Sequence, residues 1–542
     1  MKRIFALALA LLLLLGLVGC NSDSGDPTTG GISNAEKIVI YTGGSSEFIW
    51  TAGADEQAVW DAVEKKFYED TGIALEFEVN FMGQDMKPKV ATAISGGAQV
   101  DIMISHTGGG DGVDDWMYYN NNYADLYDAI EDYGEHIIEN SLWTDGELTL
   151  DALRRLTTTE GHIIGIPSVI NPYKYGILVR KDWMEACGYT DDPAKADTIF
   201  QGEQKYILVD NFATFADMCE AMKNKYGLNY AVTGAVWDFE KVGLPGAYGL
   251  DAGYWQYTVY EYKGEKYYVP GGGVEGYVDV LAVESEWARR GVRNPSGNAV
   301  LIDQAESEFI AGSTGVFIED PTVTHLIAVA RKCKLANPEA EFTVLGAMPK
   351  DAESTEVGAL RNTVSNFAAC VYKASTQVEN IVKFVDWMYS DPDNYLMCTY
   401  GIEGVHWENN GDGTYSYLGD YSLTNKPYSG VLALVENQNV ANLTYSGYTE
   451  EELQWIKTVQ NKDLYLNNPC YDLLVLTHDE TLNTPLWSAY HSISTFCELS
   501  WRGKKSPEMI QSTYINNTEE FMKIISERGK VMYGIFESLT ES

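Results

Sequence analysis

The feature that most constrains the fold is a regular alternation of strand and helix patterns near the start of the chain's body. Lys37–Tyr41 (KIVIY), Ala74–Val79 (ALEFEV) and Val100–Ile104 (VDIMI) are β-branched or alternating apolar runs, which predict strands. Helical spacing fills both gaps between them, over residues 55–72 and 86–95. Because a helix that connects two strands returns the chain to the same edge of a sheet, this pattern predicts a parallel sheet with right-handed crossovers.

The first of these helices has recognisable ends. Asp55 stands where a side chain can cap the first turn, and Gly72 stands where a left-handed residue ends a helix. The apolar residues between them recur at helical spacing: Val59, Ala62, Val63 and Phe67. A later helix is expected to begin at Thr214 and to stop at Gly227. Such stripes are core faces and give no reason to predict a cofactor.

The first twenty residues differ from the rest of the chain. Two basic residues precede an apolar run over residues 4–18, which is short for a membrane span of about 20 residues. The stretch LVGC, which ends at Cys20, resembles the lipobox of bacterial lipoproteins and implies removal of residues 1–19 and lipidation of Cys20. An uncleaved N-terminal anchor is the alternative. Residues 20–35 are small and polar, which predicts a flexible tether.

The charge of the chain excludes one class of partner. Lys and Arg total 38 against 78 for Asp and Glu, so the formal net charge is -40. Nucleic acid would be repelled over most of such a surface, and no basic stripe overrules the average. The charge is compatible with neutral or cationic ligands. No segment after the leader is apolar over 18 residues, so no other membrane span is expected.

Signatures of catalysis and metal binding are missing from the sequence. It contains no HExxH, GxSxG or GxxxxGK[ST] motif. GGGVEG at residues 271–276 lacks the acidic residue that dinucleotide sites carry about twenty positions later. NNGDGT at residues 409–414 lacks the spaced ligands of a calcium loop and predicts a hairpin turn. We therefore expect no catalytic residue, no cofactor and no metal, and we expect Cys370, within FAACVY, in the core.

Long loops crowded with aromatic residues and glycine lie between the periodic segments, at residues 108–127, 236–262 and 400–421. Neutral sugars present a C–H face and an edge of hydroxyls, so a sugar binder needs flat aromatic platforms beside amide and carboxylate side chains. The chain has 36 Tyr and 13 Trp to supply such platforms. Each aromatic residue taken singly is as consistent with packing as with binding. Together the loops favour a wet, aromatic cleft for a glycan.

Three stretches that follow one another in the chain resemble a known family. GHIIGIPSV (Gly161–Val169), YGILVRKDWMEACG (Tyr175–Gly188) and YGIEGVHWE (Tyr400–Glu408) lie behind the lipobox-like leader. In this order they are similar to the family 1 extracellular solute-binding lipoproteins of bacterial ABC transporters, especially the large oligosaccharide-type members. The likeness covers most of the body, from about Glu36 to near Ser506.

The resemblance implies an α/β fold with two lobes, of the type II periplasmic-binding-protein class to which maltose-binding protein belongs. Each lobe would be a mostly parallel sheet flanked by helices, and a hinge would join the lobes. Residues 36–165 and 345–400 would form the first lobe, and residues 170–340 and 400–542 the second. The ligand would lie in the cleft between the lobes and be enclosed when the hinge closes.

Candidate ligand-binding residues follow predicted strands or lie in the aromatic loops. In open α/β sheets, ligands gather at the carboxyl ends of strands, where glycine lets backbone amides approach closely. The residues expected to contact the ligand are Trp50, Asp111 and Trp116 from one lobe, Trp237, Trp255, Glu319 and Asp320 from the other, and Glu403 and Trp407 from the GIEGVHW stretch. His406, in the same stretch, is expected to be structural.

These expectations describe a lipid-anchored receptor without catalytic activity, on the outer face of the cytoplasmic membrane. It would capture an oligosaccharide or related glycan and deliver it to the permease subunits of an ABC importer. We expect a monomer that touches the membrane only through its lipid. Two alternatives remain open: a cell-surface lipoprotein enzyme that acts on glycans, and a binder of cationic small solutes, which the net charge favours.

Overall fold

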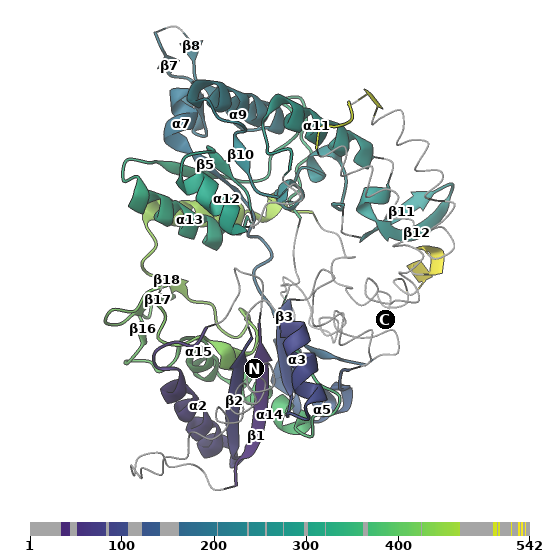
Figure 1. The fold of residues 1–542 in the computed structure, drawn as a ribbon, viewed down its shortest axis with the longest axis vertical. Helices are drawn as coiled ribbons and strands as arrows, with labels where there is room; N and C mark the ends of the chain where they lie inside the picture. Colours follow the sequence, from purple (N-terminus) through teal and green to yellow (C-terminus); the bar gives the residue numbers. More distant parts are fainter. Residues whose placement is uncertain are drawn as a thin grey trace, which may run out of the picture.

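The computed structural model describes residues 34–43, 51–82, 86–106, 122–140 and 162–466, the last range with gaps at 203, 236–237, 255–256, 275, 297–301, 320, 361–366 and 424, and short runs between 502 and 537. These residues form two lobes, each built on its own β-sheet (Figure 1). Across the described residues, no helix combines the length and the apolar character that a membrane crossing requires.

The first lobe is built on a five-stranded sheet in the order β2-β1-β3-β15-β4. Its strands are β1 (Glu36–Thr42), β2 (Leu75–Phe81), β3 (Ile102–His106), β4 (Gly165–Pro167) and β15 (Phe367–Val371). β1 pairs in parallel with β2 and β3, as the alternation of strand and helix patterns predicts. β15 runs antiparallel to both of its neighbours, β3 and β4. All strands except β15 therefore point in one direction.

Helices cover both faces of the first sheet because successive side chains of a strand point to opposite faces. Ile38 and Ile40 pack in one cluster with residues of α2, α5, α6, α14 and α15. Val39 and Tyr41 pack on the other face, where Val90 of α3 joins them. The helices are α2 (Glu56–Thr71), α3 (Met86–Ser95), α5 (Tyr127–Tyr133), α6 (Glu135–Glu139), α14 (Val378–Ser390) and α15 (Pro392–Tyr400).

The second lobe has a four-stranded sheet in the order β10-β13-β5-β14. The strands are β5 (Ile177–Arg180), β10 (Val232–Thr233), β13 (Val316–Phe317) and β14 (Phe342–Leu345). β10 and β13 are parallel, and β5 runs antiparallel to β13 and β14. One face packs on α7 (Lys181–Ala186), α9 (Phe212–Tyr226) and α11 (Tyr277–Arg290). The other packs on α12 (Ile302–Ile310), α13 (Val323–Ala336) and α16 (Glu450–Val459).

Small elements decorate this frame. The short helices are α8 (Pro193–Ala196) and α10 (Asp238–Lys241), with single 3₁₀ turns at Gly246–Tyr248, Gly271–Gly273, Val431–Ala433 and Lys462–Leu464. The small strands are β6 (Tyr189–Thr190), β7 (Ile199–Phe200), β8 (Gln204–Lys205), β9 (Ile207–Leu208), β11 (Tyr257–Tyr262), β12 (Glu265–Pro270), β16 (Trp407–Asn409), β17 (Thr414–Tyr417) and β18 (Thr444–Tyr445). β11 and β12 form a hairpin on the second lobe (Figure 1).

The reversed strand in each sheet is the first one after the chain enters that lobe from the other lobe. The chain leaves the first sheet at the end of β4 and next forms β5; it leaves the second sheet at the end of β14 and next forms β15. Because both crossings start from the edge where the parallel strands end, the chain enters the next sheet from that same edge. It must therefore run against the neighbouring strands there.

The expected assignment of residues 400–542 to the second lobe is wrong for the first part of that range. Residues 431–435 (VLALV) are buried in the same core as Ile38 and Phe384 of the first lobe. Leu396 of α15 shares a second cluster with side chains of β16, β17 and β18. The chain enters the second lobe again only with α16. The apolar run explains the difference, since it gains hydrophobic free energy by packing in the core that contains residues of α2 and α15.

Five cysteines within the described residues are not in disulfide bonds: Cys187, Cys219, Cys333, Cys370 and Cys398. Cys370 is 3% exposed, as its apolar surroundings in the sequence predict. The described lobes therefore depend on their apolar cores, not on cross-links between these thiols.

Candidate ligand-binding site

The loops that follow β10 and β13 begin side by side at the edge of the second lobe where the crossing segments leave it. The amide of Ile318 donates to the carbonyl of Thr233 at 3.1 Å, which carries the pairing just beyond the two strands. Gly234 has a φ of +130°, and a Cβ added there would lie 2.7 Å from the backbone nitrogen of Glu319. Only glycine fits this close approach, and it lets the two loops start in contact.

Glu319 fastens these two loops to each other. Its side chain is largely buried, with the residue 8% exposed, and its Oε2 accepts a hydrogen bond from the amide of Ala235 at 2.5 Å. The sequence predicts Glu319 as a ligand contact. That contact stays a prediction; in the structure, this carboxylate oxygen also holds a backbone amide two residues before Trp237 in the sequence, which anchors the loop.

Glu240 in α10 is a second buried carboxylate in this part of the second lobe. It accepts a hydrogen bond from the amide of Tyr254 at 2.8 Å and another from the phenol of Tyr277. Burial raises the pKa of Glu240 to about 7, against the lowering effect of the bonds from Tyr277 and Tyr254. Glu240 thus fixes the backbone directly before Trp255. No sequence motif marks this glutamate, although it lies in the aromatic loop at residues 236–262.

The facing edge of the first lobe is organised by Glu56 at the start of α2. This residue is 7% exposed, and its carboxylate accepts from the amide of Gly53 at 2.8 Å and from the amide of Ser429 at 2.9 Å. The amide of Asp55 donates in turn to the carbonyl of Pro427 at 3.0 Å. A helix that follows a parallel strand begins at the carboxyl edge of the sheet, so these bonds fasten residues 427–429 to that edge.

Lys426 lies on this fastened segment, directly before Pro427. Its residue is exposed, yet the surrounding protein lowers the pKa of its ammonium by burial, while Glu436 acts in the opposite direction. The backbone carbonyl of Glu436 accepts from the amide of Val169, two residues beyond the end of β4. Lys426 therefore stands near the carboxyl edge of the first sheet. No motif in the sequence points to it.

Three chain segments meet where the lobes join. The amide of Gly176, before β5, donates to the carbonyl of Pro321 at 2.9 Å. Ala359, on the way from β14 to β15, forms a bridge with Tyr465, and its amide donates to the carbonyl of Leu464 at 2.7 Å. The phenol of Tyr465 accepts from the amide of Tyr175 at 3.0 Å. Both loop edges described above thus lie next to the joining segments, as a cleft between lobes requires.

Trp407 is the predicted site residue that the structure most clearly reassigns. It is 2% exposed, its indole donates to the carbonyl of Gly401 at 2.8 Å, and its ring packs against that of Tyr400 at 5.5 Å between centroids. A buried ring with a satisfied N–H is a core residue. The same stretch holds Glu403, whose exposed side chain accepts from the amide of Asn409 at 3.2 Å. The stretch GIEGVHW therefore forms a packed turn.

His406 is structural within the same turn, as expected. Its Nδ1 accepts a hydrogen bond from the amide of Ile402 at 3.0 Å, and the residue is 2% exposed. Burial lowers its pKa, which the nearby carboxylate of Asp55 opposes. An imidazole held neutral in this way acts as a hydrogen-bond acceptor at ordinary pH.

The remaining predicted contacts fall outside the described residues, as does the predicted lipidation site Cys20. The ligand contacts concerned are Trp50, Asp111, Trp116, Trp237, Trp255 and Asp320. They stay predictions. What the structure adds is the placement of the segments next to them, through Gly53, Ala235, Tyr254 and Glu319.

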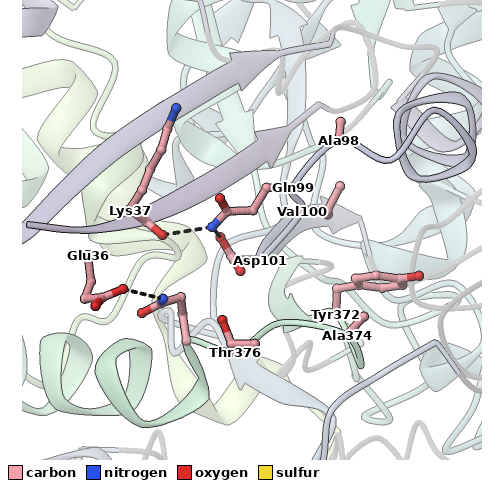
Figure 2. A pocket seen from close by; sticks show the side chains of 10 residues that line it. Glu36, Lys37, Ala98, Gln99, Val100, Asp101, Tyr372, Ala374 and Thr376 are labelled. Atoms are coloured by element: carbon pink, nitrogen blue, oxygen red, sulfur yellow. Dashed lines mark hydrogen bonds between the residues drawn. The ribbon is translucent and has the colours of Figure 1, made fainter.

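A polar cavity of about 360 Å³ lies at the other edge of the first sheet (Figure 2). It is bounded by the start of β1, the residues before β3 and those after β15. Gln99 donates to the carbonyl of Lys37 at 2.9 Å and to Asp101 at 2.7 Å, and Gln377 donates to Glu36 at 3.2 Å. The polar groups of this cavity thus hydrogen-bond to one another. They lie at the amino ends of the parallel strands, away from the edge where ligands collect.

The sequence NNGDGT forms the predicted hairpin turn between β16 and β17. The amide of Asn410 donates to the carbonyl of Thr414 at 3.0 Å, and Asp412 accepts from the amide of Thr414 at 3.0 Å. Among the described residues, no group of three or more His, Cys, Asp or Glu side chains is arranged to hold a metal ion. The turn is therefore explained by its own backbone and side-chain bonds.

Comparison with proteins of known sequence and structure identifies a distant relative and several similar folds. No protein-family model matches the chain. The chain is 21% identical over 336 residues to the polygalacturonan/rhamnogalacturonan-binding protein YtcQ of Bacillus subtilis, a match that covers 60% of this chain and 62% of YtcQ. The similarity thus spans less than two thirds of that relative's length.

Several solved structures share the fold. The N-glycan transport solute binding protein NgtS of Streptococcus pneumoniae matches with a TM-score of 0.61 and 14% identity over 93% of this chain and 99% of that chain. The alginate-binding protein AlgQ2 matches with a TM-score of 0.61 and 13% identity over 95% and 99%. An HMO-binding, ABC-transporter-associated protein of Bifidobacterium longum infantis matches with a TM-score of 0.58 and 12% identity over 93% and 99%. The expected two-lobed fold of solute-binding proteins is confirmed.

Proposed function

We propose that this chain is the solute-binding component of a bacterial ABC importer and that it captures an oligosaccharide between its two lobes. The observation that carries the proposal is the fold, which extends over nearly the whole length of carbohydrate-binding transport proteins. The curated relative is likewise a binder of carbohydrate polymers. At both lobe edges, buried carboxylates fasten loops beside the joining segments, which prepares a surface for a ligand.

The proposed role is binding without chemical change. The similar proteins above are all named as binding proteins. Glu319 and Glu240 are committed to backbone amides, so neither is a good candidate for acid or base catalysis. A glycosidase needs two carboxyl groups across one bond of its substrate. We therefore expect the ligand to leave the protein intact.

The N-terminal region indicates where in the cell the protein would act. Cleavage before Cys20 and lipidation of that cysteine would hold the protein on the outer face of the cytoplasmic membrane, beside its permease. Cys20→Ala is expected to release the protein from membranes or to stall its processing in cells. Fractionation with an antibody measures this, and a variant that is still lipid-linked would refute the anchor.

Titration with a panel of oligosaccharides tests the binding function. The soluble body, beginning after Cys20, should show a saturable change in tryptophan fluorescence with at least one glycan, and calorimetry should give a matching affinity. Chromatography of the same mixture should recover the glycan uncleaved after long incubation. Product formation that disappears when one carboxylate is replaced would favour an enzyme, and binding only of cationic solutes would favour a different receptor.

A further inference from the structure

The backbone around Lys426 is held firmly on both sides. Before it, Ser422 and Asn425 form a tight turn with reciprocal backbone bonds of 3.1 and 3.2 Å. After it, the carbonyl of Pro427 accepts from the amide of Asp55, and the hydroxyl of Ser429 donates to Glu56 at 2.5 Å. A long side chain on such a fixed backbone presents its charge at a defined place, which lowers the entropy cost of binding a partner.

The charge on Lys426 has no counter-ion within the described part of the chain. Several other lysines in this strongly acidic protein pair with carboxylates, as Lys241 does with Asp238 at 2.7 Å and Lys66 with Asp70 at 2.8 Å. Lys426 makes no such pair, and Glu436 acts on it only through the electrostatic field. The ammonium is exposed and the surrounding protein nonetheless partly desolvates it, so a charged ligand group beside it would be screened less than in open water.

We propose that Lys426 binds the carboxylate of an acidic sugar in the cleft, so that this protein selects carboxylated oligosaccharides over neutral ones. The inference rests on the oligosaccharide-binding function proposed above and specifies its ligand class. An ammonium donates charge-assisted hydrogen bonds to a carboxylate, and such bonds are stronger than those to neutral hydroxyls. The carboxylate belongs either to a uronic acid or to a sialic acid, and the two are distinguished by experiment.

The net charge of the chain makes a local cation necessary for such a ligand. At -40, the average field repels an anionic oligosaccharide at long range. At physiological ionic strength this field decays over about 8 Å, whereas a direct contact is little screened. Direct contact with one unpaired, desolvated ammonium at the edge where ligands collect would therefore favour an anionic group locally.

The test compares matched acidic and neutral ligands. Tetragalacturonate, its fully methyl-esterified form and a sialylated lactose are titrated calorimetrically into the wild-type protein, Lys426→Met, Lys426→Arg and the control Lys65→Met. Lys65 lies on α2 of the same lobe and is 74% exposed. Wild-type protein should bind one acidic ligand at least about tenfold more tightly than the neutral ester, as loss of a charge pair typically costs that much or more.

Lys426→Met should lose that preference while keeping its affinity for the ester, Lys426→Arg should retain most of the preference, and Lys65→Met should behave as wild type. Equal affinity of wild-type protein for acid and ester, or an unchanged preference in Lys426→Met, overturns the inference but leaves the binding function in place. If wild-type protein binds neither these ligands nor any glycan of the neutral panel, the proposed function itself fails. A thermal melt of each variant confirms that it is folded.

Discussion

Three buried glutamates each fasten a loop at a different point of the cleft edge. Glu56, Glu240 and Glu319 each accept a backbone amide from a loop next to a predicted aromatic platform. A carboxylate that accepts such bonds in a dry environment orders a loop more firmly than a neutral group would, because the bonds are charge-assisted. The cost is the burial of an ionisable group, and for Glu240 that cost makes the stability of the protein depend on pH.

Glu240 gives a prediction about pH. Its pKa rises from an ordinary 4.5 to about 7 because of burial. Below about pH 4.5 it is protonated in the folded and unfolded states alike; between about 4.5 and 7 only the unfolded state ionises, so stability falls as pH rises through this window. Glu240→Gln copies the protonated form. Its melting temperature should therefore match that of wild type near pH 4 and exceed it near pH 8, by differential scanning fluorimetry.

The comparison between the two proteins isolates this one group. Glu64 in α2 also has a pKa raised to about 7 by burial, but it is present in both proteins and cancels in the difference. An equal difference in melting temperature at both pH values would show that Glu240 does not titrate in this range.

Trp407 gives a second prediction at the scale of one residue. Because its ring is buried among Tyr400 and Tyr415, Trp407→Ala should lower the free energy of unfolding by about 3–5 kcal/mol. The dissociation constant for a glycan should stay unchanged in the folded fraction. Urea denaturation and calorimetry measure the two quantities. A large loss of affinity with intact stability would restore Trp407 to the binding surface.

Single residues also mark the limit of what the sequence predicts about the site. Trp407 lies in a stretch as rich in aromatic and polar side chains as any other loop, and its burial depends on packing against Leu396 and Tyr415, which no local pattern singles out as its partners. Lys426 is the opposite case, because no feature of the sequence marks it. Bonds of Asp55 and Glu56 to the residues that follow it place its backbone, and Glu436 acts on its charge. Long-range contacts of this kind leave no local pattern to read.

At the scale of elements, local periodicity predicts the frame well and the helix ends less well. α2 ends at Gly72 in the left-handed conformation, as predicted, yet the side chain of Asp55 makes no capping bond and instead accepts from the phenol of Tyr421. α9 begins at Phe212, capped by Asn211, two residues before the predicted Thr214. In α2, the phenol of Tyr421 donates to the side chain of Asp55, which then does not cap the helix. In α9, Asn211 lies upstream of Thr214 with an equal capping propensity, so the helix begins earlier than predicted.

The joining segment between β14 and β15 depends on tight glycine contacts, which give a prediction for an element. A Cβ at Gly246 would lie 2.2 Å from the carbonyl oxygen of Gly358. Gly246→Ala must therefore push this segment away from the second lobe, and the free energy of unfolding should fall by about 1–3 kcal/mol. Urea denaturation monitored by tryptophan fluorescence measures the loss.

Gly96 serves as the matched control for this substitution. A Cβ there meets nothing closer than 3.4 Å, so Gly96→Ala should change the free energy of unfolding by less than about 1 kcal/mol. Equal effects of both substitutions would mean that the contact with Gly358 is not tight in solution.

The molecule as a whole is organised by the places where the chain changes lobe. It crosses after β4, after β14 and again before α16, and the second-lobe side of these crossings is fastened by backbone bonds to Pro321 and Leu464. The resemblance of the sequence to solute-binding proteins predicts two lobes and a third crossing near residue 400, but the chain crosses only after the run VLALV. The place of that crossing depends on the burial of VLALV in the core that also contains residues of α2 and α15.

Crossings concentrated at one place allow the lobes to rotate as rigid bodies, which leads to a prediction for the whole molecule. A single compact body of this length would have a radius of gyration of about 24 Å, and two separated lobes must exceed it. Closure around a ligand should bring the radius of gyration down toward that value, since side chains at both loop edges gain contacts only in the closed form. Small-angle scattering with and without a saturating glycan measures this. Binding without closure would leave the shape of the protein, and therefore its scattering, unchanged. Identical scattering curves at saturation would therefore contradict a hinge mechanism, even if calorimetry shows tight binding.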